Sequence, residues 1–156
     1  MDNKQKRTFI LFEVAGSTYA APSQSVQQMH MIEQITPLPN APEFVDGAVF
    51  VRGQVLPAMN LRLRFGFERT ANTLRSRLII VNSGNRTVAL IADSAREFLS
   101  IPPDEIQPPP PSIAGLSGSY LEGIATVGDR IILIIDIDKI IRTESVASIG
   151  ERHGEN

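Results

Sequence analysis

The feature that most constrains the fold of this chain is an internal repeat. When the sequence is shifted by 76 positions, the stretch 44–61 falls on 120–137 without a gap. Each copy opens with an aromatic residue, an apolar residue, an acid and a glycine, as Phe44-Val45-Asp46-Gly47 and as Tyr120-Leu121-Glu122-Gly123. Each then continues as two apolar runs around a glycine-containing turn and ends at Asn60 or Asp136, which opens a short helix. This shared pattern and spacing argue against a chance match.

The repeat extends upstream and predicts an all-β fold. At a shift of 69, Tyr19-Ala20 meets Val88-Ala89, and Met29 meets Phe98. Each half therefore supplies about five short strands, and neither half is large enough to bury a good core alone. Because closure removes unpaired strand edges, we expect two small closed β-barrels packed on each other. A groove between the two barrels would then be available to a partner.

Local patterns place the elements within this plan. Apolar and β-branched runs between turn residues predict strands at 8–14, 18–21, 26–32, on either side of Arg52-Gly53, and at 77–82, 87–92, 96–101, 120–127 and 130–135. Short helices are predicted at 61–66, ended by Gly66, and at 136–141, capped by Asp136. A single helical turn is predicted at 22–26. Six prolines predict that 102–112 is a stiff, polyproline-like spacer.

These elements define one domain over residues 8–142. It divides into two pseudo-repeated subdomains at about 9–66 and 77–137, between which strands can be shared. The polar ends, 1–7 and 143–156, are predicted to be flexible tails.

The composition excludes several classes of partner and location. The formal net charge is -2, and the fifteen Lys and Arg residues are scattered singly, so we expect no nucleic-acid partner. The chain has no cysteine, which excludes disulfides and thiolate metal sites. Residues 1–7 do not resemble a signal peptide, and the most apolar run, 131–135, is too short to enter a membrane as a span. We therefore expect a cytoplasmic protein.

The titratable residues predict no catalysis and no cofactor. His30 lies in a predicted strand and His153 in the predicted tail, so both are interpreted as surface histidines. Helix capping explains Asp136 and Asp138 better than a metal pair does. The glycine-rich stretch 115–118 precedes a strand and not a helix, unlike a phosphate-binding loop.

Charged residues near the first repeat have other expected roles. Arg62 and Arg64 flank an apolar stripe and are interpreted as a solvated helix face. Asp93 follows a strand, so we expect it to accept a hydrogen bond from a turn backbone, with an ion pair to an arginine as the alternative. Arg52 stands at a tight turn beside Gly53 with no local partner, which makes it a candidate contact residue.

Protein binding is the function that the apolar residues favour. The chain offers more apolar surface than one barrel interior needs, in the residues Val26, Met29, Met31, Val49, Phe50 and Val51. Some of them must line a groove or face outward, and methionine suits surfaces that accept a helix.

A set of motifs identifies a family. They are Pro37-Leu38-Pro39-Asn40-Ala41-Pro42, Phe44-Val45-Asp46-Gly47, Arg52-Gly53-Gln54-Val55-Leu56-Pro57, Leu61-Arg62-Leu63-Arg64-Phe65-Gly66, Asp93, Tyr120-Leu121-Glu122-Gly123 and Ile132-Leu133-Ile134-Ile135-Asp136-Ile137-Asp138. In this order and spacing, the chain resembles the CheW family of chemotaxis adaptors over about residues 8–142. The resemblance implies two SH3-like five-stranded β-barrel subdomains, short helices including a C-terminal one, and no catalysis.

The resemblance also implies partners. CheW-like proteins join the cytoplasmic tip of methyl-accepting chemoreceptors to the regulatory domain of a CheA-type histidine kinase, and pack into rings that can include contacts between CheW copies. They work in the cytoplasm, on membrane-anchored receptor arrays. Carried over by position, the receptor-binding residues are Val26, Gln28, Gly47, Val49 and Arg52. Val26 would contact the receptor helix, Arg52 would hydrogen-bond or steady the groove, and Gly47 would allow close backbone approach. The resemblance assigns no kinase-binding residues here.

Two residues depart from the family pattern. Phe50 stands where Asn is common, and Gln28 stands where an acid is common. These changes would fit a different receptor, or a CheW-like scaffold in a pathway other than swimming, such as surface motility or gene regulation. A less favoured alternative is a small-molecule sensor that uses the groove between the barrels as its pocket.

Overall fold

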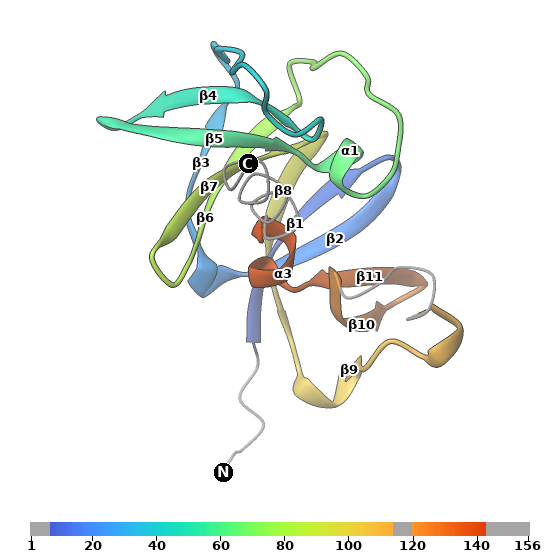
Figure 1. Cartoon of the computed structure of the whole chain (residues 1–156). Coiled ribbons are helices and arrows are strands. Elements are labelled where there is room, and N and C mark those ends of the chain that lie inside the picture. Colours follow the sequence, from blue (N-terminus) through green and yellow to red (C-terminus); the bar gives the residue numbers. More distant parts are fainter. Residues whose placement is uncertain (1–6, 114–119, 143–156) are drawn as a thin grey trace, which may run out of the picture.

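The computed structural model describes residues 7–113 and 120–142, which form two β-sheets with short helices between and beside them (Figure 1). The predicted tail 143–156, His153, the glycine-rich stretch 115–118 and all of the predicted tail 1–7 except Arg7 lie outside these residues.

The first sheet has six strands in the order β8-β1-β2-β11-β10-β9. Its strands are β1 (Arg7–Val14), β2 (Ser17–Pro22), β8 (Ser94–Ile101), β9 (Ile106–Gln107), β10 (Leu121–Val127) and β11 (Arg130–Ile135). The second sheet has five strands in the order β3-β6-β7-β5-β4. Its strands are β3 (Val26–Met31), β4 (Val45–Val51), β5 (Gln54–Asn60), β6 (Arg77–Ser83) and β7 (Arg86–Ala92). The helices are η1 (Ser23–Ser25), α1 (Leu61–Arg64), η2 (Pro103–Glu105) and α3 (Ile137–Ile141).

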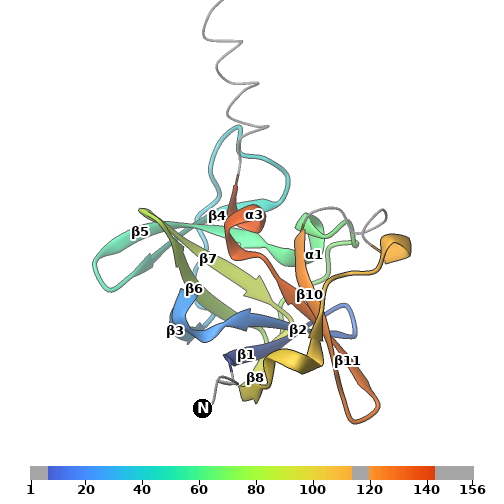
Figure 2. The same cartoon turned by 90° about the horizontal axis from the view of Figure 1, so that it is seen from below.

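The two sequence repeats form equivalent backbone structures. The Asn60 amide donates to the carbonyl oxygen of Phe44 at 2.7 Å, and the Asp136 amide donates to that of Tyr120 at 2.8 Å. Asn60 caps α1 and Asp136 caps α3 through their side chains. The β4–β5 and β10–β11 hairpins project on opposite sides of the molecule (Figures 1 and 2). Each hairpin then joins the rest of its sheet by a parallel pairing, β5 with β7 and β11 with β2.

The sheets combine strands from both halves of the sequence. The first sheet contains β1 and β2 from the first half and β8 to β11 from the second, whereas the second sheet contains β3 to β5 from the first half and β6 and β7 from the second. Each half thus gives its opening hairpin to one sheet and its remaining strands to the other.

The expected all-β fold with short helices is confirmed, but the expectation of closed barrels is wrong. Neither sheet is closed by a pairing between its end strands, β8 and β9 or β3 and β4, in the described residues. In the second sheet, the chain between β3 and β4 crosses this opening. It pairs with the β4 edge as a single bridge between Thr36 and Ala48.

The expected polyproline-like spacer is also only partly correct. Residues 103–105 form η2, and Ile106–Gln107 forms β9, which pairs with β10 at Ile124 and Ala125. The prolines flank this pairing: the two pairing residues themselves carry backbone amides, which proline lacks.

The core has a central cluster between the sheets and a smaller cluster within each sheet. Phe12, Tyr19 and Phe65 stack in series through the central cluster, with ring centroids 5.8 Å and 4.9 Å apart. The C-terminal helix α3 buries Ile137, Ile140 and Ile141 against the same cluster. Burial of large apolar side chains in one place holds the two sheets together.

The arginines of α1 do not form the solvated face that we expected. Arg62 makes a bidentate ion pair with Asp93, with Nη2 2.8 Å from Oδ2, and this hydrogen bonding raises the pKa of Arg62. Asp93 Oδ2 also accepts a hydrogen bond from the Ala15 amide at 2.8 Å. Both alternatives for Asp93 are therefore present at once, because a carboxylate offers several acceptor positions.

Arg64 reaches across to the C-terminal helix. Its Nε donates to the carbonyl oxygen of Ile140 at 2.9 Å, and its Nη2 donates to that of Arg142 at 2.7 Å. Its guanidinium also lies over Phe44 and Tyr120, 4.4 Å and 5.0 Å from the ring centroids. One side chain thus joins the equivalent aromatic residues of the two repeats.

Candidate protein-binding site

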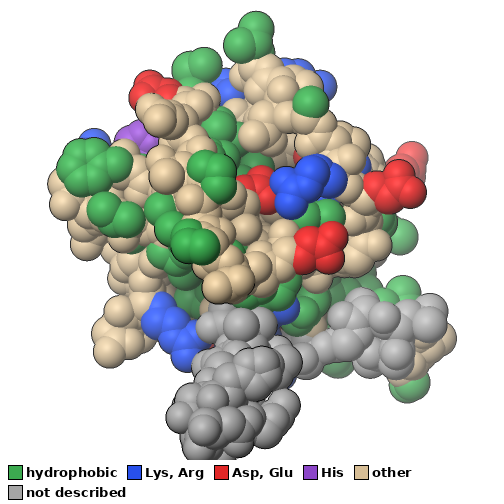
Figure 3. Space-filling model, turned by 45° about the horizontal axis from the view of Figure 1, so that its top comes forward, with side chains coloured by type: hydrophobic (Ala, Val, Ile, Leu, Met, Phe, Trp, Pro, Cys, Tyr) green, Lys and Arg blue, Asp and Glu red, His purple; other side chains and the backbone are tan. Residues whose placement is uncertain are grey.

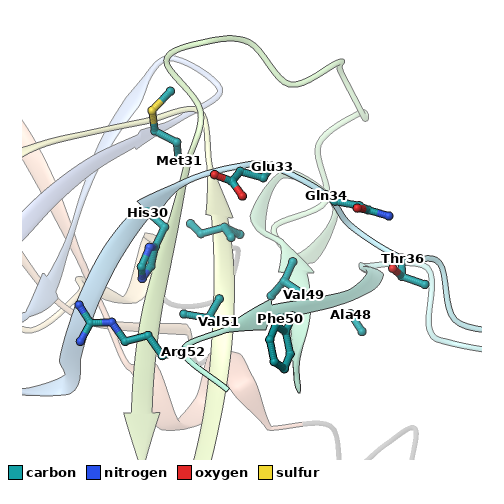
Figure 4. A pocket seen from close by; sticks show the side chains of 11 residues that line it. His30, Met31, Glu33, Gln34, Thr36, Ala48, Val49, Phe50, Val51 and Arg52 are labelled. Carbon is teal, nitrogen blue, oxygen red and sulfur yellow. The ribbon is translucent and has the colours of Figure 1, made fainter. Parts of the chain in front are cut away.

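A pocket of about 520 Å³ lies along the opening of the second sheet, between β3 and β4 (Figure 4). The residues that line it are His30, Met31, Glu33, Gln34, Thr36, Ala48, Val49, Phe50, Val51, Arg52 and Leu78. They come from β3, from the segment that follows it, from β4 and its turn, and from β6. The pocket exists because the sheet does not close at this point.

The floor of the pocket is apolar because side chains alternate along β4. Val49 and Val51 point inward and join Leu78 in the interior cluster of the second sheet. Phe50, between them, points outward with 73% of its surface exposed. Its cross-strand neighbour Val55 is also exposed, so an apolar pair stands on the outer face of this hairpin. Hydrophobic side chains are visible on this face in Figure 3, with the histidine beside them.

Arg52 occupies a strained turn position at the end of the pocket. Arg52 has φ 51° and Gly53 has φ 81°, the pair of positive angles that a tight hairpin turn requires. Such turns favour Asn-Gly, and holding a residue with a long side chain in the left-handed region costs about 1 kcal/mol. No hydrogen bond or ion pair joins the Arg52 side chain to the residues that the structure describes. Its side chain extends toward the β3 side of the pocket (Figure 4).

Gly47 allows a close backbone approach, but the approaching backbone belongs to the same chain. A Cβ at this position would overlap the carbonyl oxygen of Thr36. Thr36 in turn pairs with Ala48, donating to its carbonyl at 2.9 Å and accepting from its amide at 2.7 Å. Gly47 therefore shapes one end of the pocket without lining it.

Gln28 and His30 lie on the inner face of β3 and are half-buried. Gln28 Oε1 and His30 Nε2 are 2.7 Å apart, so the glutamine is linked to the pocket through the histidine. His30 is thus a lining residue and not simply the surface histidine that we expected.

The structure separates Val26 from the other residues carried over from the family. Val26 is half-buried and packs against the central cluster. Of the five residues, Val49 and Arg52 line the pocket, and Gly47 and Gln28 contact residues that line it. The pocket lies within the second sheet and not between two barrels, where we expected a groove.

Sequence reasoning did not assign His30, Glu33, Gln34, Thr36 or Leu78 to a site. Glu33, Gln34 and Thr36 belong to the crossing segment, and no local pattern in that segment indicates which strand it will face. The outward position of Phe50 was predictable, since it alternates with two inward-pointing valines.

The site combines an apolar floor, a cationic end and an uncovered strand edge, which are properties of a protein-binding module. In the described residues, there is no group of three His, Cys, Asp or Glu side chains placed to hold a metal ion. Among the described helices, none is long and apolar enough to span a membrane.

The chain belongs to the CheW-like domain family, whose sequence profile matches residues 8–145. It is 28% identical to the chemotaxis protein CheW of Klebsiella aerogenes over 141 residues, which cover 90% of this chain and 85% of that protein. It is 29% identical to protein FrzA of Myxococcus xanthus over 144 residues, which cover 90% of this chain and 88% of that protein.

A solved structure agrees with this assignment. The crystal structure of the scaffolding protein TtCheW from Thermoanaerobacter tengcongensis superposes with a TM-score of 0.82 at 30% identity, and covers 88% of this chain and 94% of that one. The family is one of non-catalytic scaffolds in chemotaxis signalling, and the two-sheet fold described above is its fold.

Proposed function

We propose that this protein is a non-catalytic adaptor that couples methyl-accepting chemoreceptors to a CheA-type histidine kinase. Membership of the CheW-like family and similarity to a scaffolding protein support the adaptor role. The single observation that carries receptor binding is Arg52, which is held at a positive φ beside a pocket with an apolar floor and has no side-chain partner among the described residues. In this proposal, the protein acts in the cytoplasm on membrane-anchored arrays, where copies also contact the kinase and one another.

Receptor binding is proposed to involve Val26, Gln28, Gly47, Val49 and Arg52. Arg52 supplies hydrogen bonds to the receptor, Val49 supplies the apolar floor, and Gly47 keeps the crossing segment in place. Gln28 orients His30, and Val26 contributes from the start of β3.

The charge-reversing variant Arg52→Glu tests this proposal. We expect its affinity for a receptor cytoplasmic fragment to fall about thirtyfold, which corresponds to an interface hot spot of about 2 kcal/mol. Co-sedimentation with receptor fragments, measured at constant salt, would detect the change. Arg130→Glu is the matched control, because Arg130 is exposed beside the equivalent turn of the second repeat. Equal receptor binding by both variants would contradict the proposed role.

A CheW-like scaffold for a pathway other than swimming is a second candidate. Phe50 is largely exposed, and Gln28 bonds to His30 and not to Arg52, so this surface differs in charge and shape from one with an acid at position 28. A pull-down from the native cell would decide between the two candidates: a chemoreceptor that controls swimming would support the first, and a receptor for surface motility or gene regulation would support the second.

The pocket also gives a small-molecule sensor a specific basis, because its volume lies in the range of ligand sites. A rise in melting temperature with metabolites, in the absence of any protein partner, would support a sensor and count against a purely protein-binding site.

A further inference from the structure

We propose that the uncovered part of the β4 edge binds an extended, acidic segment of a partner protein as an added β-strand. This goes beyond receptor coupling, because the proposed receptor contact is with a helical tip and this one is with an extended chain. The proposal rests on three properties of the same place: free backbone groups, an apolar floor and an unpaired cation.

The backbone groups of Phe50 point into the opening. Ala48 directs its amide and carbonyl away from β5, since both are bonded to Thr36 on the other side of β4. Phe50 lies two residues further along the same strand, so its amide and carbonyl point in the same direction. No hydrogen bond from the described residues reaches them. An edge with unpaired groups is a template for another strand.

The chain itself pairs with this edge two residues before Phe50, at Ala48. Thr36 forms both backbone hydrogen bonds with Ala48, but this bridge is isolated, and the preceding residues Glu33 and Gln34 line the pocket without pairing with β4. A partner segment that continues from this point toward Arg52 would bond to Phe50 in the same way. One of its side chains would face the apolar floor formed by Val49, Val51 and Leu78.

The charge of the partner follows from Arg52. Its guanidinium has no acceptor among the described residues and lies at the end of the edge that the partner would follow. His30 lies on the opposite wall, where its Nε2 is 2.7 Å from Gln28 Oε1. Among the described residues that line the pocket, Glu33 is the one acid, and it comes from the crossing segment. A carboxylate near Arg52 would therefore be favoured over a neutral or basic side chain.

The second repeat has its own segment at the equivalent edge. There, β9 pairs with β10 at Ile124 and Ala125, the positions that correspond to Ala48 and Val49. β9 is therefore the counterpart of the segment that ends at Thr36, which pairs with Ala48. Thr126, the counterpart of Phe50, lies beyond the residues that β9 pairs with.

The test starts from a phage-displayed library of random eight-residue peptides, panned against the full chain. We expect enrichment of sequences with Asp or Glu within two residues of an apolar residue. A synthetic peptide of the most enriched sequence should shift the backbone amide resonances of residues 48–52 and bind in an extended conformation. No enrichment over an unrelated control protein, shifts at another surface, or a helical bound peptide would each overturn the proposal.

Two variants then separate the backbone from the charge. Phe50→Pro removes the outward amide and is compatible with an edge position, whereas Phe50→Ala removes only the ring. We expect the synthetic peptide to bind Phe50→Pro at least tenfold more weakly than Phe50→Ala. Thr126→Pro, at the equivalent position of the second repeat, is the control and should leave peptide affinity unchanged. If Phe50→Pro fails to fold, Arg52→Glu gives the same decision: an unchanged affinity for the acidic peptide overturns the proposal, and a tenfold loss supports it.

Discussion

Single residues decide the shape of the opening in the second sheet. Gly47 is the residue past which the crossing segment runs, and Thr36 is the residue that ties this segment to β4. Arg52 then sets the charge at the other end of the pocket. Each of these roles depends on the backbone as much as on the side chain, since two of the three residues have positive φ angles.

At this scale, we predict that Gly47→Ala destabilises the protein by about 2 kcal/mol or more, because the added Cβ would overlap the Thr36 backbone, which cannot move without losing its bridge. Chemical denaturation measures the loss. Gly123→Ala is the matched control from the second repeat, where the nearest atoms are the Ile106 Cγ2 methyl at 2.9 Å and the Gln107 carbonyl oxygen at 3.1 Å. A smaller loss is expected there, since these atoms are farther from the added Cβ than the Thr36 carbonyl oxygen is at position 47. Equal losses would contradict this explanation.

At the scale of elements, short helices hold the two sheets in register. α1 follows β5, and α3 follows β11; together with the central cluster, they fill the space between the sheets. Arg64 links the two helices through carbonyl groups at the end of α3 and through the aromatic rings that begin each repeat. Arg62 and Asp93 join α1 to the β1–β2 turn in a similar way.

We predict that Arg64→Ala lowers the free energy of unfolding by about 1–3 kcal/mol, because the carbonyl oxygens of Ile140 and Arg142 lose a hydrogen-bond donor and two aromatic rings lose their cation. Hydrogen exchange of the α3 amides, 137–141, should accelerate more than exchange elsewhere. Arg64→Lys keeps the charge but cannot make the same forked hydrogen bonds, so most of the loss should remain. Full recovery of protection in the lysine variant would mean that charge alone matters.

At the scale of the whole molecule, the fold depends on the exchange of strands between the two halves of the sequence. Each sheet needs strands from both halves, and the central cluster contains residues from both. The sequence repeat therefore does not correspond to two independently assembled sheets.

We predict that fragments 1–71 and 72–156, produced separately, show no cooperative thermal transition, because each lacks strands that complete its sheets. Mixing the fragments should restore both the transition and the dispersed amide spectrum of the intact chain. The cut falls in an exposed segment outside all described helices and strands. A cooperative transition in either fragment alone would contradict the prediction.

Much of the local structure was predictable from sequence. The hairpins, the short capped helices and the equivalence of 44–61 and 120–137 follow from turn residues, alternation and capping, which act over a few residues. The partners of Arg62, Arg64 and Asp93 were harder to predict, since Arg62 and Asp93 are 31 residues apart and Arg64 and Ile140 are 76 apart.

By itself, the sequence determined the all-β class, the twofold repeat and the CheW-like family, because these depend on local patterns and on motif order. Only the tertiary structure decided that the halves exchange strands, that the sheets stay open, and that the pocket lies at the β3–β4 opening. These outcomes depend on which strand edges meet in space, and an edge carries no sequence signal of its own partner. The same reason explains why the turn position of Arg52 was predictable from local pattern, whereas the surface around it was not.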